Sequence, residues 1–163
     1  MSFIQNKIGF MSKLVIFSLA MIISTITHAA NLDSPIGYWK TIDDVSGKPK
    51  SIVHITEAAD HTLQGIVVKI YPSPGKDENE VCSACRDEKH DQRIVGMQIL
   101  TGMQLNEDRW SGGKILDPVN GKYYRCTMRV INDGQQLSVR GYIGFPLLGR
   151  SQTWNRVDIN KKE

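Results

Sequence analysis

The chain has 163 residues, of which 40% are hydrophobic and 23% are charged, and its formal net charge is +3. This length suits one domain. The near balance of 20 basic and 17 acidic residues excludes the strongly basic composition typical of nucleic-acid-binding proteins. We therefore expect no nucleic-acid partner.

The first 29 residues have the pattern of a cleavable signal peptide. Lys13 precedes an apolar run at 14–23, and Thr27-His28-Ala29 supplies small residues where a signal peptidase cuts. The run is shorter than the roughly 20 residues of a membrane-spanning helix. We expect cleavage after position 29, export, no transmembrane anchor afterwards, and one domain over 30–163. The start of translation is either Met1 or Met11.

Beyond this leader, apolar and polar residues alternate in short runs separated by Gly, Pro, Asn and Asp, which is typical of antiparallel strands. The predicted strands cover 37–42, 51–56, 63–71, 97–105, 109–116, 122–131, 136–143 and 150–157. Gly112-Gly113 has no helix after it and predicts a bend or bulge in the fifth strand. Asn120-Gly121 predicts a tight hairpin turn.

About eight strands joined mostly by short turns predict an all-β fold. We expect a single antiparallel up-and-down β-barrel, because closing the sheet removes both exposed edges. A barrel of this size holds either side chains or one small ligand. An open sandwich is the alternative architecture.

The inward face of the predicted strands supplies the candidate ligand-binding residues. They would line a cavity that is apolar with a few polar tips: Met97, Ile99, Met103, Leu105, Tyr124, Met128 and Val139. Flexible methionines suit a pocket that accepts variable ligands. A core filled solid by the same side chains is the alternative.

A long polar loop at 72–95 interrupts the strand pattern and contains Cys82-Ser83-Ala84-Cys85. In an oxidising compartment we expect a Cys82–Cys85 disulfide, which leaves Cys126 as a small buried hydrophobe. A thioredoxin-type redox pair is an alternative, but such a pair normally opens a helix beside a parallel sheet. A zinc site on Cys82, Cys85 and His90 is another, but the spacing puts Val95 at the fourth ligand.

The segment at 144–149, Gly-Phe-Pro-Leu-Leu-Gly, is more apolar than a hairpin loop usually is. We expect it to cap the mouth of the barrel. Contact with a partner or membrane, or inert folding back, are the alternatives.

Catalytic patterns are missing from the sequence. Asp43 and Asp44 are adjacent, so on a strand they point to opposite faces. His54 and His61 flank one predicted hairpin at no metal-ligand spacing and are expected to face solvent. Nucleophile-elbow, zinc-protease and phosphate-loop motifs do not occur. We expect a non-catalytic protein without metal or cofactor.

Several motifs, in this order, resemble the exported bacterial proteins of the domain of unknown function 2147 family. They are Gly37-x-Trp39, Cys82-x-x-Cys85, Ile94-Val95-Gly96, the segment 110–118, Gly121-Lys122-x-Tyr124 and the segment 140–144. The likeness runs from Gly37 to Arg156. It implies a lipocalin-type barrel, a periplasmic or secreted location and small-molecule binding, and it supplies no catalytic residues.

The lipocalin-type fold implies a role for two more residues. In such barrels a first-strand Trp packs at the closed end under a basic side chain from the last strand, and Trp39 and Arg156 match these positions. A guanidinium over an indole contributes about 0.5–2 kcal/mol. We therefore expect this pair to close the barrel structurally.

Two functions follow from these expectations. The first is an exported barrel that binds a small apolar or amphipathic molecule without transforming it. The alternative is a protein–protein interaction module of the cell envelope, with the loops at 76–93 and 144–149 as contact surfaces and the barrel as scaffold. An enzyme site at the barrel mouth, near Arg140 and Tyr142, is the weakest possibility.

Overall fold

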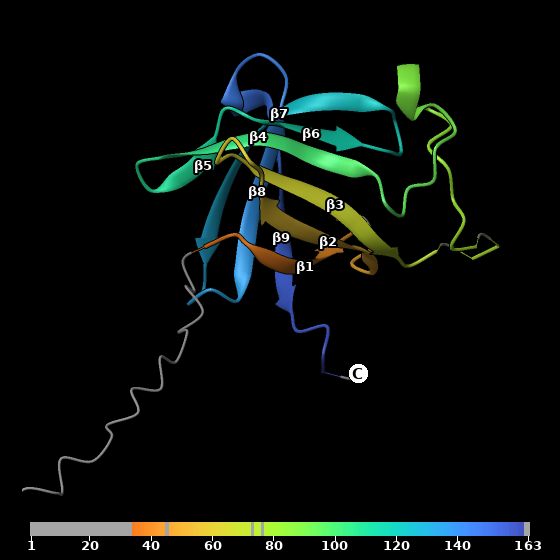
Figure 1. Ribbon diagram of the computed structural model, residues 1–163, viewed down its shortest axis with the longest axis horizontal. Helices are drawn as coiled ribbons and strands as arrows, with labels where there is room; N and C mark the ends of the chain where they lie inside the picture. Colours follow the sequence, from red (N-terminus) through yellow and green to blue (C-terminus); the bar gives the residue numbers. More distant parts are fainter. Residues whose placement is uncertain (1–33, 45, 73, 76, 162–163) are drawn as a thin grey trace, which may run out of the picture. The chain divides into compact units, whose positions relative to one another are not determined.

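The computed structural model describes residues 34–44, 46–72, 74–75 and 77–161, which belong to one compact unit. The predicted signal peptide at 1–29 lies outside the described residues. The regular secondary structure of the described chain is almost entirely β-strand, with two 3₁₀ turns of three residues each (Figure 1). Its elements are β1 (Gly37–Ile42), β2 (Pro49–Glu57), β3 (Leu63–Ile70), η1 (Asp87–Lys89), β4 (Gln98–Asn106), β5 (Arg109–Ser111), β6 (Lys114–Asp117), β7 (Lys122–Ile131), β8 (Gln136–Tyr142), η2 (Pro146–Leu148) and β9 (Arg150–Val157).

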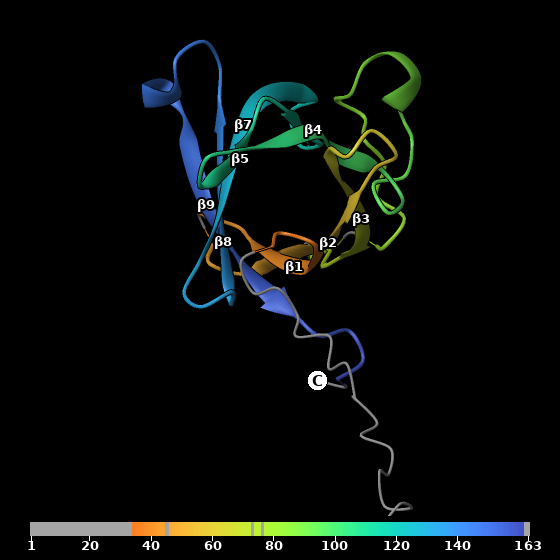
Figure 2. The same ribbon diagram turned by 60° about the vertical axis from the view of Figure 1, so that its left-hand side comes forward.

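The strands form a closed antiparallel barrel, seen from its end in Figure 2. From β1 to β4 and from β7 to β9 each strand pairs with the next one in sequence, and β9 pairs with β1 to complete the ring. Both β5 and β6 lie between β4 and β7, so they act as one interrupted strand of an eight-stranded barrel. The predicted up-and-down barrel is confirmed.

The interruption between β5 and β6 falls at Gly112-Gly113, where the sequence predicted a bend. Gly112 has a φ of +82°, in the left-handed region. A Cβ on Gly113 would collide with the carbonyl of Thr101 on β4, so only glycine permits the two backbones to approach this closely.

The regular alternation predicted for the fourth strand is wrong in part. The pairing of β3 with β4 shifts register on both sides of Gly65, and Gly102 has a φ of +67°. As a result, Ile99 and Leu100 are both buried although they are adjacent. The strand also continues beyond the buried part of the barrel, and Leu105 is reached only after that point.

The core of the barrel receives side chains from all eight strands. Trp39 of β1 and Trp154 of β9 are the largest fully buried residues. The other interior members include Val53, Ile55, Leu63, Val67, Leu100, Met103, Cys126, Met128, Leu137 and Val139. This cluster occupies the interior that a hollow barrel would leave for a ligand.

One loop prediction needs correction. The segment at 144–149 does not cap the barrel, since Phe145, Leu147 and Leu148 are exposed. His54 lies half-buried on the outer face of β2, where its ring stacks on Tyr38 with the centroids 4.0 Å apart. Tyr38 and His54 are paired in register across β1 and β2, which places the two flat rings face to face.

Candidate functional site

The predicted ligand-binding residues are mostly part of the packed core. Met97, Ile99, Met103, Met128 and Val139 are all buried and belong to the core cluster. Side chains that lined a water-sized space would keep exposed surface, and these have almost none. A ligand would have to displace packed atoms to reach them.

The remaining two predicted residues lie at opposite ends of the barrel. Tyr124 is half-buried, and its hydroxyl accepts a hydrogen bond from Asn120 Nδ2 at 3.0 Å, beside the β6–β7 turn. Leu105 is 59% exposed and lies next to the β4–β5 turn. The structure therefore does not bring the seven residues together around one cavity.

Leu105 instead contributes to an open cleft. This cleft lies at one end of the barrel, the end where the β4–β5 turn and Trp39 are found. The cleft has a volume of about 430 Å³. It is lined by Ser34, Leu105, Glu107, Asp108, Trp110, Arg129 and Val130. Leu105 is directly opposite Trp110, and Trp110 is directly opposite Met128, so an apolar wall continues from the core into the cleft.

The rim of the cleft is charged. Asp108 forms ion pairs with Arg129, at 2.9 Å between Oδ2 and Nη2, and with Arg109, at 3.4 Å between Oδ1 and Nε. Glu107 adopts a φ of +55° in the turn, and within the described residues its carboxylate has no ion-pair partner. An apolar wall beside a charged rim suits an amphipathic molecule.

Sequence reasoning did not select most of this cleft. It identified Leu105 but assigned it to the interior, and it read 106–108 only as a turn. The sequence feature that could have indicated the cleft is Trp110, a large apolar residue two positions after the polar turn Asn106-Glu107-Asp108. A partly exposed Trp at a strand end is typical of a binding surface.

Close to this end, Trp39 and Arg156 form the predicted closure. Arg156 donates from Nη1 to Ile36 O at 3.0 Å and from Nη2 to Ser34 O at 2.7 Å, and Nε contacts Gly134 O. The Trp39 indole N–H donates to Pro35 O at 2.7 Å. Burial lowers the pKa of Arg156. The pair therefore fixes the segment that enters β1 and serves structure.

The other end of the barrel has a polar network at its mouth. The Trp154 indole N–H donates to Gln152 Oε1 at 3.1 Å, and Gln152 Nε2 donates to Asp44 Oδ1 at 2.8 Å. Arg150 also donates from Nε to Asp44. Thr41 and Ser51 share a buried hydroxyl hydrogen bond of 2.8 Å. These groups satisfy one another, which leaves this mouth polar and internally bonded.

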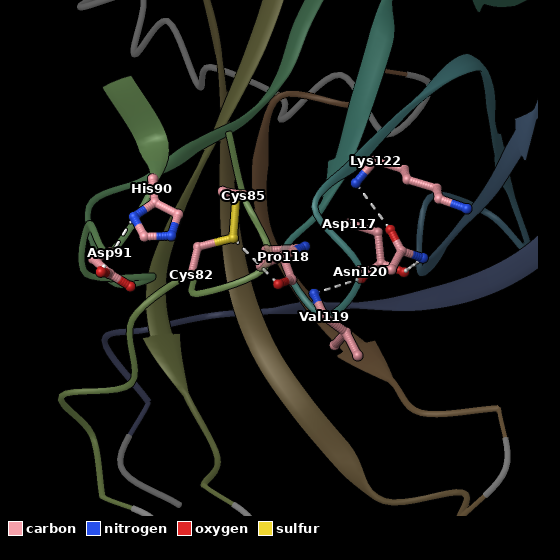
Figure 3. The surroundings of a disulfide bond; sticks show 9 residues. All are labelled: Cys82, Cys85, His90, Asp91, Asp117, Pro118, Val119, Asn120 and Lys122. Carbon is pink, nitrogen blue, oxygen red and sulfur yellow. Dashed lines mark hydrogen bonds and ion pairs between the residues drawn. A yellow bond between two sulfur atoms is a disulfide. The ribbon is translucent and has the colours of Figure 1, made fainter. Parts of the chain in front are cut away.

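The predicted disulfide is confirmed: Cys82 and Cys85 are bonded, with their Cα atoms 5.3 Å apart (Figure 3). The bond lies against the turn that follows β6, where the Cys82 sulfur is 3.2 Å from the Pro118 carbonyl oxygen. A Cβ on Gly121 would collide with the Ala84 carbonyl. The disulfide loop is therefore docked on the β6–β7 turn.

The bonded sulfurs cannot serve as zinc thiolates, and no helix begins at this pair as a thioredoxin-type site would require. His90 Nδ1 lies 3.2 Å from Asp91 Oδ2, on the exposed side of the loop. Within the part of the chain that the structure describes, no group of three or more His, Cys, Asp or Glu side chains is placed to hold a metal ion.

The third cysteine, Cys126, is a free thiol inside the barrel. It is fully buried, and this burial raises its pKa to about 12. A thiol in this state carries almost no thiolate at neutral pH, so it packs as a small hydrophobe.

The helices of the described residues are short, and none of them is long and apolar enough to cross a membrane.

Comparisons with known proteins agree with this fold. Residues 37–156 match the family profile described as uncharacterized protein conserved in bacteria (DUF2147). No curated protein sequence matches the chain. Among solved structures, the chain is similar to protein HP1028 of the human pathogen Helicobacter pylori, reported as a member of the lipocalin family. The TM-score is 0.65 at 17% sequence identity, and the match covers 78% of this chain and 86% of that one.

Proposed function

The chain belongs to the DUF2147 family of bacterial proteins, and we propose that it is an exported, non-catalytic, lipocalin-like barrel that binds a small amphipathic molecule in the cleft beside Trp110. The observation that carries this proposal is the open cleft whose apolar wall is formed by Leu105, Trp110 and Val130.

The size and chemistry of the cleft support a small ligand. Its volume of about 430 Å³ falls within the roughly 300–1,000 Å³ usual for small-molecule sites. The apolar part of a ligand would lie on Leu105 and Trp110. Its polar head would meet the carboxylate of Glu107, which has no ion-pair partner among the described residues and favours a cationic or hydrogen-bond-donating group.

The cleft is a better candidate than the barrel interior. Met103 and Met128 are buried against other core side chains, whereas Leu105 and Trp110 keep surface that solvent reaches. Binding in the cleft removes that apolar surface from water without disrupting the core.

Two observations support export to the periplasm or to the exterior. The Cys82–Cys85 disulfide is typical of an oxidising compartment, and the leader at 1–29 has the pattern of a signal peptide. Cell fractionation followed by amino-terminal sequencing tests this. We expect the envelope or medium fraction to contain a chain that begins near Ala30, and a cytoplasmic chain with an intact leader would contradict export.

Tryptophan fluorescence tests the binding site directly. Trp39 and Trp154 are buried, so Trp110 is the partly exposed indole of the three. We expect an amphipathic cationic probe, dansylcadaverine, to accept energy from Trp110, and we expect Leu105→Asp to weaken binding at least about tenfold by placing a charge on the apolar wall. Val119→Asp is the matched control, because Val119 is exposed but belongs to the opposite end of the barrel.

The result that contradicts this assignment is equally specific. Probe affinity unchanged in Leu105→Asp, together with unchanged energy transfer in Trp110→Phe, would place binding elsewhere. Native mass spectrometry of the protein purified from its own cells is the independent measurement, and a bound small molecule that Leu105→Asp loses is the expected result.

The predicted alternative, a protein–protein interaction module, receives less support. Of its two loops, the one at 76–93 is docked on the β6–β7 turn through Ala84 and Gly121, so part of its surface is already used. The loop at 144–149 is the feature that favours contact with a surface, because its apolar side chains are exposed.

A further inference from the structure

The loop between β8 and β9 displays four large apolar side chains to solvent. Phe145 is 76% exposed, Leu147 92% and Leu148 80%, and Ile143 precedes them at 60%. Single exposed apolar residues are common on protein surfaces, but a cluster of four marks a contact site. We call this cluster the apolar tip.

The apolar tip is held in position by the barrel. Arg140 of β8 donates to Pro146 O from Nε at 2.8 Å and from Nη2 at 2.6 Å, and its Nη1 donates to Ser151 Oγ at 2.9 Å. Gly149 has no space for a Cβ, which would lie 2.7 Å from Gly141 O. The side chains of the tip are therefore presented outward on an ordered loop, so contact requires little further ordering.

Two exposed cations, Lys114 and Arg125, lie beside the tip. Lys114 of β6 is directly opposite Arg125 of β7, and Arg125 is directly opposite Tyr142, where the loop begins. Both cations are exposed, and within the described residues neither has an acidic partner. Like charges directly opposite each other destabilise a strand pair unless an anion neutralises them.

Acidic residues of the disulfide loop lie at one border of the basic area, by which we mean the surface around Lys114 and Arg125. Burial raises the pKa of Tyr123, and the negative charges of Glu88 and Asp87 on the disulfide loop raise it further. The strands β5–β9 themselves contain one acidic residue, Asp117, which belongs to the β6–β7 turn network. The cations near the tip therefore remain available to an external anion.

We propose that the apolar tip, with Lys114 and Arg125 beside it, docks this protein on an anionic lipid surface. A convex apolar tip flanked by cations matches the boundary between acyl chains and charged headgroups. A protein strand is a poorer occupant, because the closed barrel offers no free strand edge for pairing. The tip enters the boundary and the cations contact the headgroups.

Vesicle co-sedimentation at low ionic strength tests the proposal. The protein, with its disulfide formed, is mixed with vesicles of phosphatidylcholine alone or of phosphatidylcholine with about 30% phosphatidylglycerol. We expect binding to the anionic vesicles that weakens with added salt. Leu147→Ser/Leu148→Ser should lower the partition coefficient at least tenfold, and Lys114→Gln or Arg125→Gln about fivefold each.

Matched controls isolate the tip and the cations. Val119→Ser removes another exposed apolar side chain, and Lys50→Gln removes an exposed cation from β2, outside the basic area. Neither control should change partitioning. All variants are compared in the exported form, which is expected to begin near Ala30, and circular dichroism confirms that each variant keeps the barrel.

Three results would overturn the proposal. The first is equal partitioning of the parent and the Leu147→Ser/Leu148→Ser variant. The second is equal binding to neutral and anionic vesicles. The third is absence of vesicle binding combined with capture of a protein partner that the Leu147→Ser/Leu148→Ser variant loses, which would assign the tip to a protein contact instead.

Discussion

The guanidinium of Arg156 lies over the indole of Trp39, with Cζ 4.2 Å from the ring centroid. The two residues are also directly opposite each other where β9 pairs with β1. The Arg156 side chain thus covers the Trp39 indole and also donates hydrogen bonds to the carbonyls of Gly134 and Ser34. The first and last strands are therefore joined by a cation–π contact in addition to their backbone pairing.

Replacing Arg156 tests the energetic weight of this contact. We expect Arg156→Lys to lower the free energy of unfolding by about 2–4 kcal/mol, because an ammonium cannot reach three carbonyls and cover the indole at once. Urea unfolding measures the loss. Arg109→Lys, at an exposed ion pair, is the control and should cost less than about 1 kcal/mol. Equal effects of the two changes would contradict the structural role.

Two glycines with the same backbone φ distinguish the stability cost of backbone strain from the cost of a steric clash. Gly121 and Gly47 both have a φ of +67°, but a Cβ on Gly121 would collide with Ala84, whereas nothing lies within 4 Å of one on Gly47. We expect Gly47→Ala to cost about 1 kcal/mol from strain and Gly121→Ala at least about 2 kcal/mol more. Thermal unfolding measures both. Similar losses would mean that the disulfide loop is not docked on this turn.

Large-to-small substitutions decide whether the interior is filled. Met103 and Met128 are fully buried, so Met103→Ala and Met128→Ala should each lower stability by about 2–5 kcal/mol. Leu105→Ala should cost less than about 1 kcal/mol, since Leu105 is largely exposed. Losses below about 1 kcal/mol at both methionines would indicate a hollow barrel.

The buried thiol of Cys126 predicts a loss of stability in alkali. Its folded pKa of about 12 lies above the ordinary value of 9.0. The native state therefore holds a proton that the unfolded state releases, so this contribution to stability is complete below about pH 9 and declines up to about pH 12. The full decline is on the order of 4 kcal/mol.

Cys126→Ala is the comparison that isolates this titration. Its stability relative to the parent should improve steadily as the pH rises from about 9 to 12, although it is the less stable protein at pH 7. Denaturant unfolding at several pH values measures the difference. A difference that stays constant across this range would contradict the assignment of the alkaline loss to Cys126.

The barrel could be predicted from the sequence because its strands are encoded by a local pattern, the alternation of apolar and polar residues. A two-residue alternation, such as Leu137 and Val139 against Ser138 and Arg140, directly encodes which side chains face inward. The Trp39–Arg156 closure was accessible because its residues occupy recognisable positions in the first and last strands. The disulfide followed from two cysteines three positions apart in an exported chain.

The cleft could not be predicted from the sequence because it depends on where strands end and how they pair in three dimensions. Alternation gives Leu105 the same direction as Met103, but it does not show where the strand leaves the buried part of the barrel. The register shifts beside Gly65 are also invisible to a count of alternating residues. Net charge likewise averages over the molecule and does not show that Lys114 and Arg125 face each other.

The pairing of β1 with β9 also sets the order of events when the protein is made. A ribosome releases β1 first and its partner β9 last, so until then β1 has an unpaired edge on one side. A nascent chain that stalls before Arg150 cannot close the ring or cover Trp39. Such truncated chains should be sensitive to proteases and prone to aggregation, and the barrel should close only after β9 has been synthesised.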